Sequence, residues 1–140
     1  MDIQTFTVST PSQTAFVDIT GKVQSALSNK GLEDGMIVVY VPHTTAGITI
    51  NENADPNVAH DIIADLERLV PRKQSYYKHY EGNSASHVKA SIMGASEIIL
   101  IQNGRLVLGT WQGIYLCEFD GPRNRRVQVG IFTCISPSDP

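Results

Sequence analysis

Apolar and polar residues alternate in several short stretches of the chain, which is the pattern of β-strands with one buried face. Residues 1–10, 14–20 and 48–51 alternate in this way and predict three strands. Residues 75–81 alternate as well, with aromatic and charged side chains on both faces, and predict an exposed strand. By contrast, residues 36–41 form a continuous run rich in β-branched side chains, which predicts a strand buried on both faces.

Three other stretches have the periodicity of helices. The spacing of apolar residues from 23 to 27 predicts a short first helix. The clearest signal covers residues 58–70, where an apolar stripe follows Asp55, a good N-cap residue. A third, short helix is predicted over residues 87–93, with Ser86 as its cap.

The last third of the chain is predicted to be β-sheet. Residues 98–101 and 105–108 flank Asn103-Gly104, the preferred two-residue turn of a hairpin. Residues 109–119 and 126–134 predict two further strands. The elements together predict an α+β fold with a mostly antiparallel, sandwich-like sheet system and two or three helices.

The length of 140 residues and the 41% of hydrophobic side chains suit one domain with its own core. We therefore expect a single domain over residues 1–140, in which the polar tail 136–140 is frayed. The chain has no apolar run long enough to cross a membrane and no export signal at its start. Cys117 and Cys134 lie in apolar runs and are expected to be reduced, buried thiols in a cytoplasmic protein.

Charge is divided unevenly along the chain, although the net charge is only −3. Residues 1–70 carry nine acidic and three basic side chains, whereas residues 71–140 carry five acidic and eight basic ones. An acidic first half argues against nucleic-acid binding. The division fits complementary faces of one domain or of neighbouring subunits. Alternatively, basic residues of the second half, such as Arg123, Arg125 and Arg126, receive an anion.

Three of the four histidines lie at the ends of predicted elements, where a scaffold presents reactive groups. They are His43, His79 and His87, whereas His60 lies on the solvent side of the predicted second helix. Three converging imidazoles could hold Zn²⁺ or a similar ion with one coordination position open. Their spacing of 36 and 8 residues is not local, so unrelated, hydrogen-bonded histidines are the alternative.

Two further groups of residues could carry chemistry. Glu52 lies between a predicted strand and the N-cap Asp55, and its carboxylate is a candidate for proton transfer or metal support. Trp111 is the single tryptophan and is flanked by Gly109 and Gly113, which suggests close approach of a flat group. A plain core position is the alternative for Trp111.

Several longer motifs resemble the YjbQ family, which is described as secondary thiamine-phosphate synthases. The resemblance runs from about residue 4 to residue 132, and the Gly-Thr-Trp-Gln-Gly run is its most specific part. The motifs are His43-Thr-Thr-Ala46, Ile50-Asn-Glu-Asn-Ala-Asp-Pro56, Tyr80-Glu-Gly82, Ser86-His-Val-Lys89 and Gly109-Thr-Trp-Gln-Gly-Ile-Tyr-Leu-Cys-Glu118.

The resemblance implies a compact α+β domain that forms a homotrimer, with a histidine-lined pocket for a metal ion or an anion. It implies a transferase that joins a pyrimidine pyrophosphate to a thiazole phosphate. The alternative is a trimeric module that binds a phosphorylated or anionic metabolite without catalysis. Either protein would act on a phosphorylated small molecule and on neither nucleic acid nor membrane.

The resemblance also suggests roles for individual residues. His43, His79 and His87 would bind a divalent metal ion, zinc or magnesium, or phosphate. Glu52 would handle protons beside these three catalytic histidines. The candidate substrate-binding residues are Asn51, Trp111, Gln112 and Arg125.

One segment departs from the family pattern. The family usually carries an acidic pair between the Glu-Gly and Ser-His motifs, where this chain has Asn83-Ser-Ala85. Asn83 is the nearest substitute, and it offers only a neutral oxygen.

Overall fold

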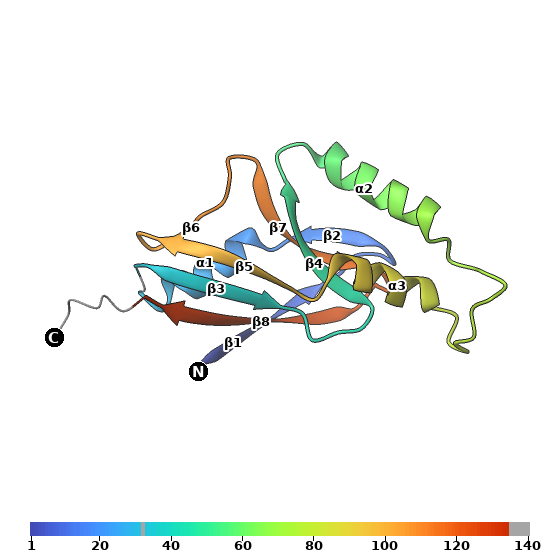
Figure 1. The fold of residues 1–140 in the computed structure, drawn as a ribbon, viewed down its shortest axis with the longest axis horizontal. Helices are drawn as coiled ribbons and strands as arrows, with labels where there is room; N and C mark the ends of the chain where they lie inside the picture. Colours follow the sequence, from blue (N-terminus) through green and yellow to red (C-terminus); the bar gives the residue numbers. More distant parts are fainter. Residues whose placement is uncertain (32, 135–140) are drawn as a thin grey trace.

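Two antiparallel sheets and three helices make up residues 1–31 and 33–134, the part of the chain that the computed structural model describes (Figure 1). The strands are β1 (Ile3–Ser9), β2 (Ala15–Asp18), β3 (Gly35–Tyr40), β4 (Ala46–Glu52), β5 (Ser96–Gln102), β6 (Arg105–Leu106), β7 (Gln112–Glu118) and β8 (Asn124–Thr133). The helices are α1 (Thr20–Ser28), α2 (Pro56–Leu69) and α3 (Ser84–Met93). The predicted α+β class is confirmed, and the predicted frayed tail 136–140 lies outside the described residues.

The strands pair as a five-stranded sheet in the order β1-β8-β3-β5-β6 and a three-stranded sheet in the order β2-β7-β4. The pairing of β4 with β7 decides which residues meet at the ends of the smaller sheet. Ala46 lies opposite Glu118 at one end, and Glu52 lies opposite Gln112 at the other. Six residue steps separate the two ends, which is about 20 Å of extended strand.

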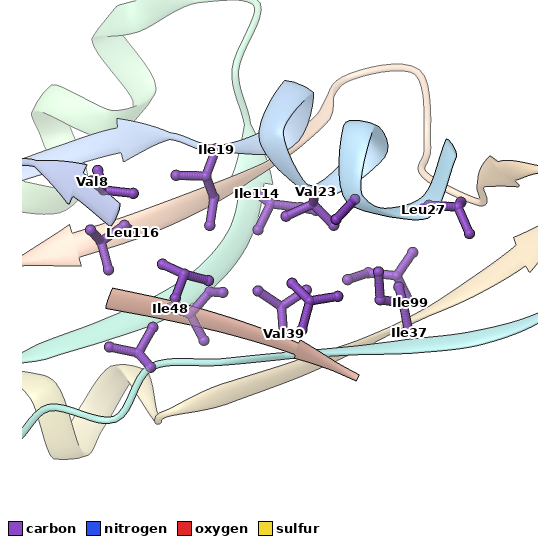
Figure 2. Packing of buried hydrophobic residues seen from close by; sticks show 14 of the residues in the cluster. Val8, Ile19, Val23, Leu27, Ile37, Val39, Ile48, Ile99, Ile114 and Leu116 are labelled. Carbon is purple, nitrogen blue, oxygen red and sulfur yellow. The ribbon is translucent and has the colours of Figure 1, made fainter. Parts of the chain in front are cut away.

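Aliphatic side chains fill the space between the two sheets (Figure 2). Ile37 of the larger sheet and Ile48 of the smaller sheet are fully buried there. α1 adds Val23 and Leu27 to the same cluster. Full burial of each such side chain contributes about 1.5–3 kcal/mol, so this cluster holds the two sheets together.

A second cluster covers the other face of the three-stranded sheet. Tyr115 and Cys117 of β7 pack there against α2 and α3, which contribute Leu66, Ala90 and Met93. The smaller sheet is therefore the middle layer, between the larger sheet and the two helices. Its strands carry side chains that are buried on both faces.

Among the described residues, no second cluster of this kind covers the outer face of the five-stranded sheet. Met36 and Tyr40 of β3 are 37% and 45% exposed, which makes the prediction of a strand buried on both faces wrong. The reason is topological, since β3 lies in the outer layer and only its Ile37 face meets the core.

Local signals placed several element boundaries correctly. The Asp55 carboxylate accepts a hydrogen bond from the Asn57 N–H at 2.9 Å and caps α2 as predicted. Asn103 and Gly104 both have positive φ, as the predicted two-residue hairpin turn requires. α3 begins one turn early, because Asn83 is its N-cap and the Ser86 hydroxyl instead donates to the Phe119 carbonyl.

The predicted strand over 75–81 is wrong. This segment has turns in which the Tyr77 N–H donates to the Gln74 carbonyl and the Gly82 N–H to the His79 carbonyl. Its alternation carries no consistent apolar face, so nothing holds it against a sheet. His79 in this segment contacts His87 of α3.

Several other strands differ from their predicted bounds. β7 begins at Gln112 because residues 109–112 form a turn, and β6 keeps only two of the four predicted residues. β8 starts two residues before the predicted 126. Both cysteines are free, and burial raises the pKa of the Cys117 thiol, whereas Cys134 is exposed and contradicts its predicted burial.

Candidate functional site

Three connecting segments meet at the end of the molecule where β4 begins and β7 ends. They are the β3–β4 connection, the β7–β8 turn and the residues that lead into α3. Between them lies a pocket of about 460 Å³, which we call the histidine pocket. Its lining residues are Pro42, His43, Thr44, Thr45, His79, Glu81, Asn83, His87, Asp120, Arg123 and Arg125.

The three histidines singled out in the sequence all line this pocket, although 44 residues separate the first from the last. His60, in contrast, lies on the exposed face of α2, where its ring nitrogen is 2.9 Å from the Asp61 carboxylate. The structure thus brings His43, His79 and His87 to one cavity and leaves the fourth histidine in solvent.

His43 is held by the backbone of β8. Its Nε2 accepts a hydrogen bond from the Arg126 N–H at 2.8 Å, so the proton of the neutral ring is on Nδ1. Burial lowers the pKa of His43, and the nearby Arg125 and Arg126 guanidinium groups lower it further. The imidazole is therefore neutral at pH 7, with the Nδ1–H as the donor it can offer a ligand.

The rings of His79 and His87 are in contact in the lining of the pocket. Their rings meet edge to face with 5.4 Å between centroids. His79 comes from the segment before α3 and His87 from its first turn. His79 Nε2 also lies 3.8 Å from the Glu81 carboxylate, so a protonated His79 has an anionic neighbour.

Beneath the histidines lies a buried ion pair. Glu118, with 0% exposure, receives two hydrogen bonds from Arg125, one to each carboxylate oxygen. Burial opposes ionisation of Glu118, but hydrogen bonds from Arg125, the Asp120 N–H and Thr10 bring its pKa below the usual range. Glu118 is therefore ionised and neutralises Arg125 at the floor of the site.

Arg125 retains one donor for a ligand. Its Nε and Nη2 are taken by Glu118 and by the Thr45 hydroxyl, the latter at 2.8 Å. Nη1 makes no hydrogen bond to any residue in 1–31 or 33–134. Since Arg125 lines the pocket, Nη1 is the guanidinium nitrogen that remains available for an anion.

A second polar cluster in the pocket is centred on Asp120. The Asp120 carboxylate accepts hydrogen bonds from Asn83 at 3.0 Å, Arg123 at 3.2 Å and Arg72 at 3.4 Å. Burial raises the pKa of Asp120, but these donors outweigh it and the net shift is downward. The amide oxygen of Asn83, also buried, has no hydrogen-bond partner among the described residues.

The residues fit a divalent metal ion only in part. Within residues 1–31 and 33–134, no group of three or more His, Cys, Asp or Glu side chains is placed to hold a metal ion. The Nε2 of His43 is occupied by the Arg126 N–H. His79, His87, Glu81 and Asp120 are the remaining ligand-type side chains that line the pocket, and the Asp120 carboxylate already accepts hydrogen bonds from Asn83, Arg123 and Arg72.

The other predicted site residues lie elsewhere. Glu52, Asn51 and Gln112 are at the far end of the three-stranded sheet, and Trp111 precedes β7 in the same place. Trp111 is 62% exposed, which makes the core alternative wrong. Within one chain, these four residues do not join the histidine pocket.

Sequence reasoning missed several residues of the pocket. Asp120 lines the pocket and Glu118 holds the lining residue Arg125, and neither was assigned a role because that role depends on partners distant in sequence. Thr45 lies two residues after His43, and its place in the His43-Thr-Thr-Ala46 motif was the signal available. Asn83 was noticed only as a departure from the family pattern.

No helix in the described ranges is long and apolar enough to span a membrane.

Comparison with known proteins gives a consistent family. A sequence model described as UPF0047 protein YjbQ-like matches residues 4–134. The UPF0047 protein YugU of Bacillus subtilis is 48% identical over 127 residues, which are 91% of this chain and 96% of that protein. A UPF0047 protein of Methanocaldococcus jannaschii is 52% identical over 126 residues, covering 90% of this chain and 91% of the relative.

Solved structures agree with these relatives. The crystal structure of an uncharacterized YjbQ/UPF0047 protein from Clostridium acetobutylicum matches with a TM-score of 0.90 and 54% identity, over 92% of this chain and 99% of that one. A conserved hypothetical protein from Thermus thermophilus matches with a TM-score of 0.86 and 44% identity, over 92% and 99%. The resemblance seen in the motifs is thus confirmed, and the chain belongs to the YjbQ (UPF0047) family.

Proposed function

We propose that the histidine pocket binds the phosphate of a small phosphorylated molecule, and that the chain is a transferase joining a pyrimidine pyrophosphate to a thiazole phosphate there. The observation that carries this proposal is the opening of three imidazoles and two arginines onto one cavity. Guanidinium and imidazole N–H groups are strong donors to phosphate oxygens. The unpaired Nη1 of Arg125 and the Nδ1–H of His43 are the first donors on offer.

The start of α3 adds to this preference for an anion. Asn83, its N-cap, and His87, in its first turn, both line the pocket. The amino end of a helix carries a partial positive charge and backbone N–H groups without intrahelical acceptors. A phosphate placed here would meet both the helix dipole and the side-chain donors.

The reaction would need stabilisation of its leaving group. A carbon–nitrogen bond forms between the pyrimidine methylene and the thiazole nitrogen, and the carbon–oxygen bond to pyrophosphate breaks. The electron pair leaves on the pyrophosphate oxygen, where Arg125 and the histidines would stabilise the added charge. A divalent ion that enters with the pyrophosphate would neutralise further charge on the leaving group.

A direct assay tests the transferase. Purified chain is mixed with the two phosphorylated substrates and magnesium, manganese or zinc, and thiamine phosphate is measured by chromatography. Turnover is expected, and His43→Ala and His87→Ala should abolish it while the exposed control His60→Ala keeps it. Absence of product with every metal removes the transferase proposal.

A binding module without catalysis is the second candidate. It is favoured by the positions and partners of three acidic side chains. Asp120 and Glu118 are engaged by arginines, and Glu52, the predicted proton carrier, lies at the far end of the sheet. A ligand that co-purifies with the chain, together with no turnover in the assay above, would favour the module. Turnover that is lost in His43→Ala would exclude it.

The predicted homotrimer stays a proposal, and the outer face of the five-stranded sheet supports it. Met36 lies opposite both Leu100 and Phe132, so exposed apolar side chains of three strands form one patch. A contiguous apolar patch is typical of an interface, and second copies of this chain are the proposed occupants. Leu100→Glu should lower the mass measured by light scattering, whereas Leu69→Glu on α2 should not.

A further inference from the structure

A second hollow adjoins the histidine pocket. It has a volume of about 390 Å³ and is lined by Tyr77, His79, Ser84, His87 and Val88. We call Tyr77, Ser84 and Val88 the apolar shelf, because the surface here is mostly carbon. His79 and His87 line both hollows, so the two adjoin each other at this histidine pair.

The shelf is built from ordered elements. Ser84, His87 and Val88 are spaced three and four residues apart on α3 and share one face of the helix. The half-buried Tyr77 lies opposite, in a turn closed by its N–H to the Gln74 carbonyl at 3.2 Å. Its ring packs edge to face on Tyr76, with 5.2 Å between centroids.

We infer that the apolar shelf holds an aromatic or heteroaromatic ring of the ligand whose phosphate occupies the histidine pocket, with Tyr77 as the ring-binding residue. This inference rests on the proposed function, because the phosphate fixes which end of the ligand faces the shelf. Small-molecule sites combine an apolar wall with a few polar anchors, and the two hollows together have that composition.

A flat ring fits the shelf better than an aliphatic chain. Tyr77 and the His79–His87 pair present aromatic surfaces, and aromatic pairs gain stability beyond the area they bury. Trp111, the aromatic wall expected from the sequence, lies at the far end of the three-stranded sheet. Tyr77 takes that role within the same chain as the phosphate donors.

Two probes that differ only in the ring test this inference on the full chain. Phenyl phosphate and methyl phosphate are titrated by calorimetry. Wild type should bind phenyl phosphate about 3- to 10-fold more tightly. Tyr77→Ala should abolish this preference and leave the affinity for methyl phosphate unchanged, and Trp111→Ala, which removes an exposed aromatic ring at the far end of the three-stranded sheet, should keep both.

A second variant outside the turn keeps the test valid if Tyr77→Ala disturbs the fold of the turn. Val88→Asn changes a 40% exposed helix position and places an amide in the shelf, so it should also reduce the preference for the ring. Equal affinities of wild type for the two probes would overturn the inference and leave the proposed phosphate site intact. Failure of both probes to bind would overturn the proposed function as well. A changed oligomeric state in Tyr77→Ala, with the ring preference kept, would show a second copy on the shelf and also overturn it.

Discussion

The two ends of the three-stranded sheet carry similar residue types but are built differently. At the histidine end, Glu118 is buried and neutralised by Arg125, and the pocket lies above that pair. At the far end, Glu52 is half-buried and Trp111 is exposed, and no charged pair is buried there among the described residues. Both ends carry residues of the family motifs, but only residues at the histidine end, such as His43 and His87, line the histidine pocket.

Hydrogen bonding separates the two ends further. At the far end, polar side chains mainly close the loops: the Gln112 side chain accepts from the Gly109 N–H at 2.8 Å, and the Asn53 amide donates to Asp18 at 3.0 Å. At the histidine end, Arg125 and His43 each keep an unused donor beside the cavity. Unused donors beside a cavity are what a bound anion requires, and the predictions below measure that difference.

The largest expected effect is on stability at the histidine end. Arg125→Ala leaves the Glu118 carboxylate buried without its partner, which should lower the free energy of unfolding by about 3–5 kcal/mol. Urea denaturation measures the change. The matched control is Arg126→Ala, because that side chain is exposed and its backbone N–H to His43 is retained. A loss of less than about 1 kcal/mol for Arg125→Ala, the value of a surface pair, would contradict the buried pair.

The next effect separates the ends by ligand binding. His43→Ala removes a donor from the pocket and should weaken phosphate binding about tenfold, the value of one charge-assisted hydrogen bond. Trp111→Ala should change the affinity by less than about twofold, since the tryptophan lies some 20 Å of strand away. Calorimetric titration with inorganic phosphate measures both. An equally large loss in Trp111→Ala would mean that the far end of one copy completes the pocket of another.

Local sequence signals predicted the parts of the fold that are governed by neighbours along the chain. Asp55 caps α2 and Asn103-Gly104 turns the hairpin, because each depends on a few adjacent residues. The exposed outer face of β3 could not be read from its composition, since burial of a strand depends on the layer in which it lies. The predicted strand over 75–81 failed for another reason, because its alternation leaves no apolar face that could pack against a sheet.

The candidate site was predictable only in its histidines. His43, His79 and His87 stood out because each lies at the end of a predicted element, and the family resemblance suggested that they meet. Glu118 could not be assigned, because its role depends on the register that places it opposite Ala46 and next to Arg125. Glu52 and Trp111 were placed in the site because their motifs are specific, but specificity of a motif does not say at which end of a strand it acts.

A smaller effect is expected from the helix start at the far end. Asp55→Ala removes the side-chain acceptor for the Asn57 N–H and should lower the free energy of unfolding by about 1 kcal/mol. Phosphate binding should be unchanged, because the cap does not line the pocket. Asn57→Ala is the control, since it keeps both the cap and the backbone donor. Weaker phosphate binding in Asp55→Ala would show that the two ends are coupled.

The smallest expected effect concerns pH and His43. Burial, together with Arg125 and Arg126, holds the pKa of His43 below its usual 6.5 in the folded chain, whereas the unfolded chain titrates near 6.5. Between these two values the unfolded state binds more protons, so the free energy of unfolding rises with pH and falls as the solution is acidified below 6.5. Urea denaturation between pH 7 and 5.5 measures this slope. Glu118 does not contribute to it, because its pKa is lowered and its stabilising contribution is lost only at more acidic pH.

His43→Gln should flatten that slope, because glutamine does not titrate, and the solvent-exposed control His60→Gln should keep it. Saturating phosphate should flatten it in wild type as well, since a bound anion beside the ring favours the imidazolium and raises the pKa of His43. A slope that phosphate leaves unchanged would place the anion away from His43. The four slopes together thus test whether His43 belongs to a site that an anion occupies.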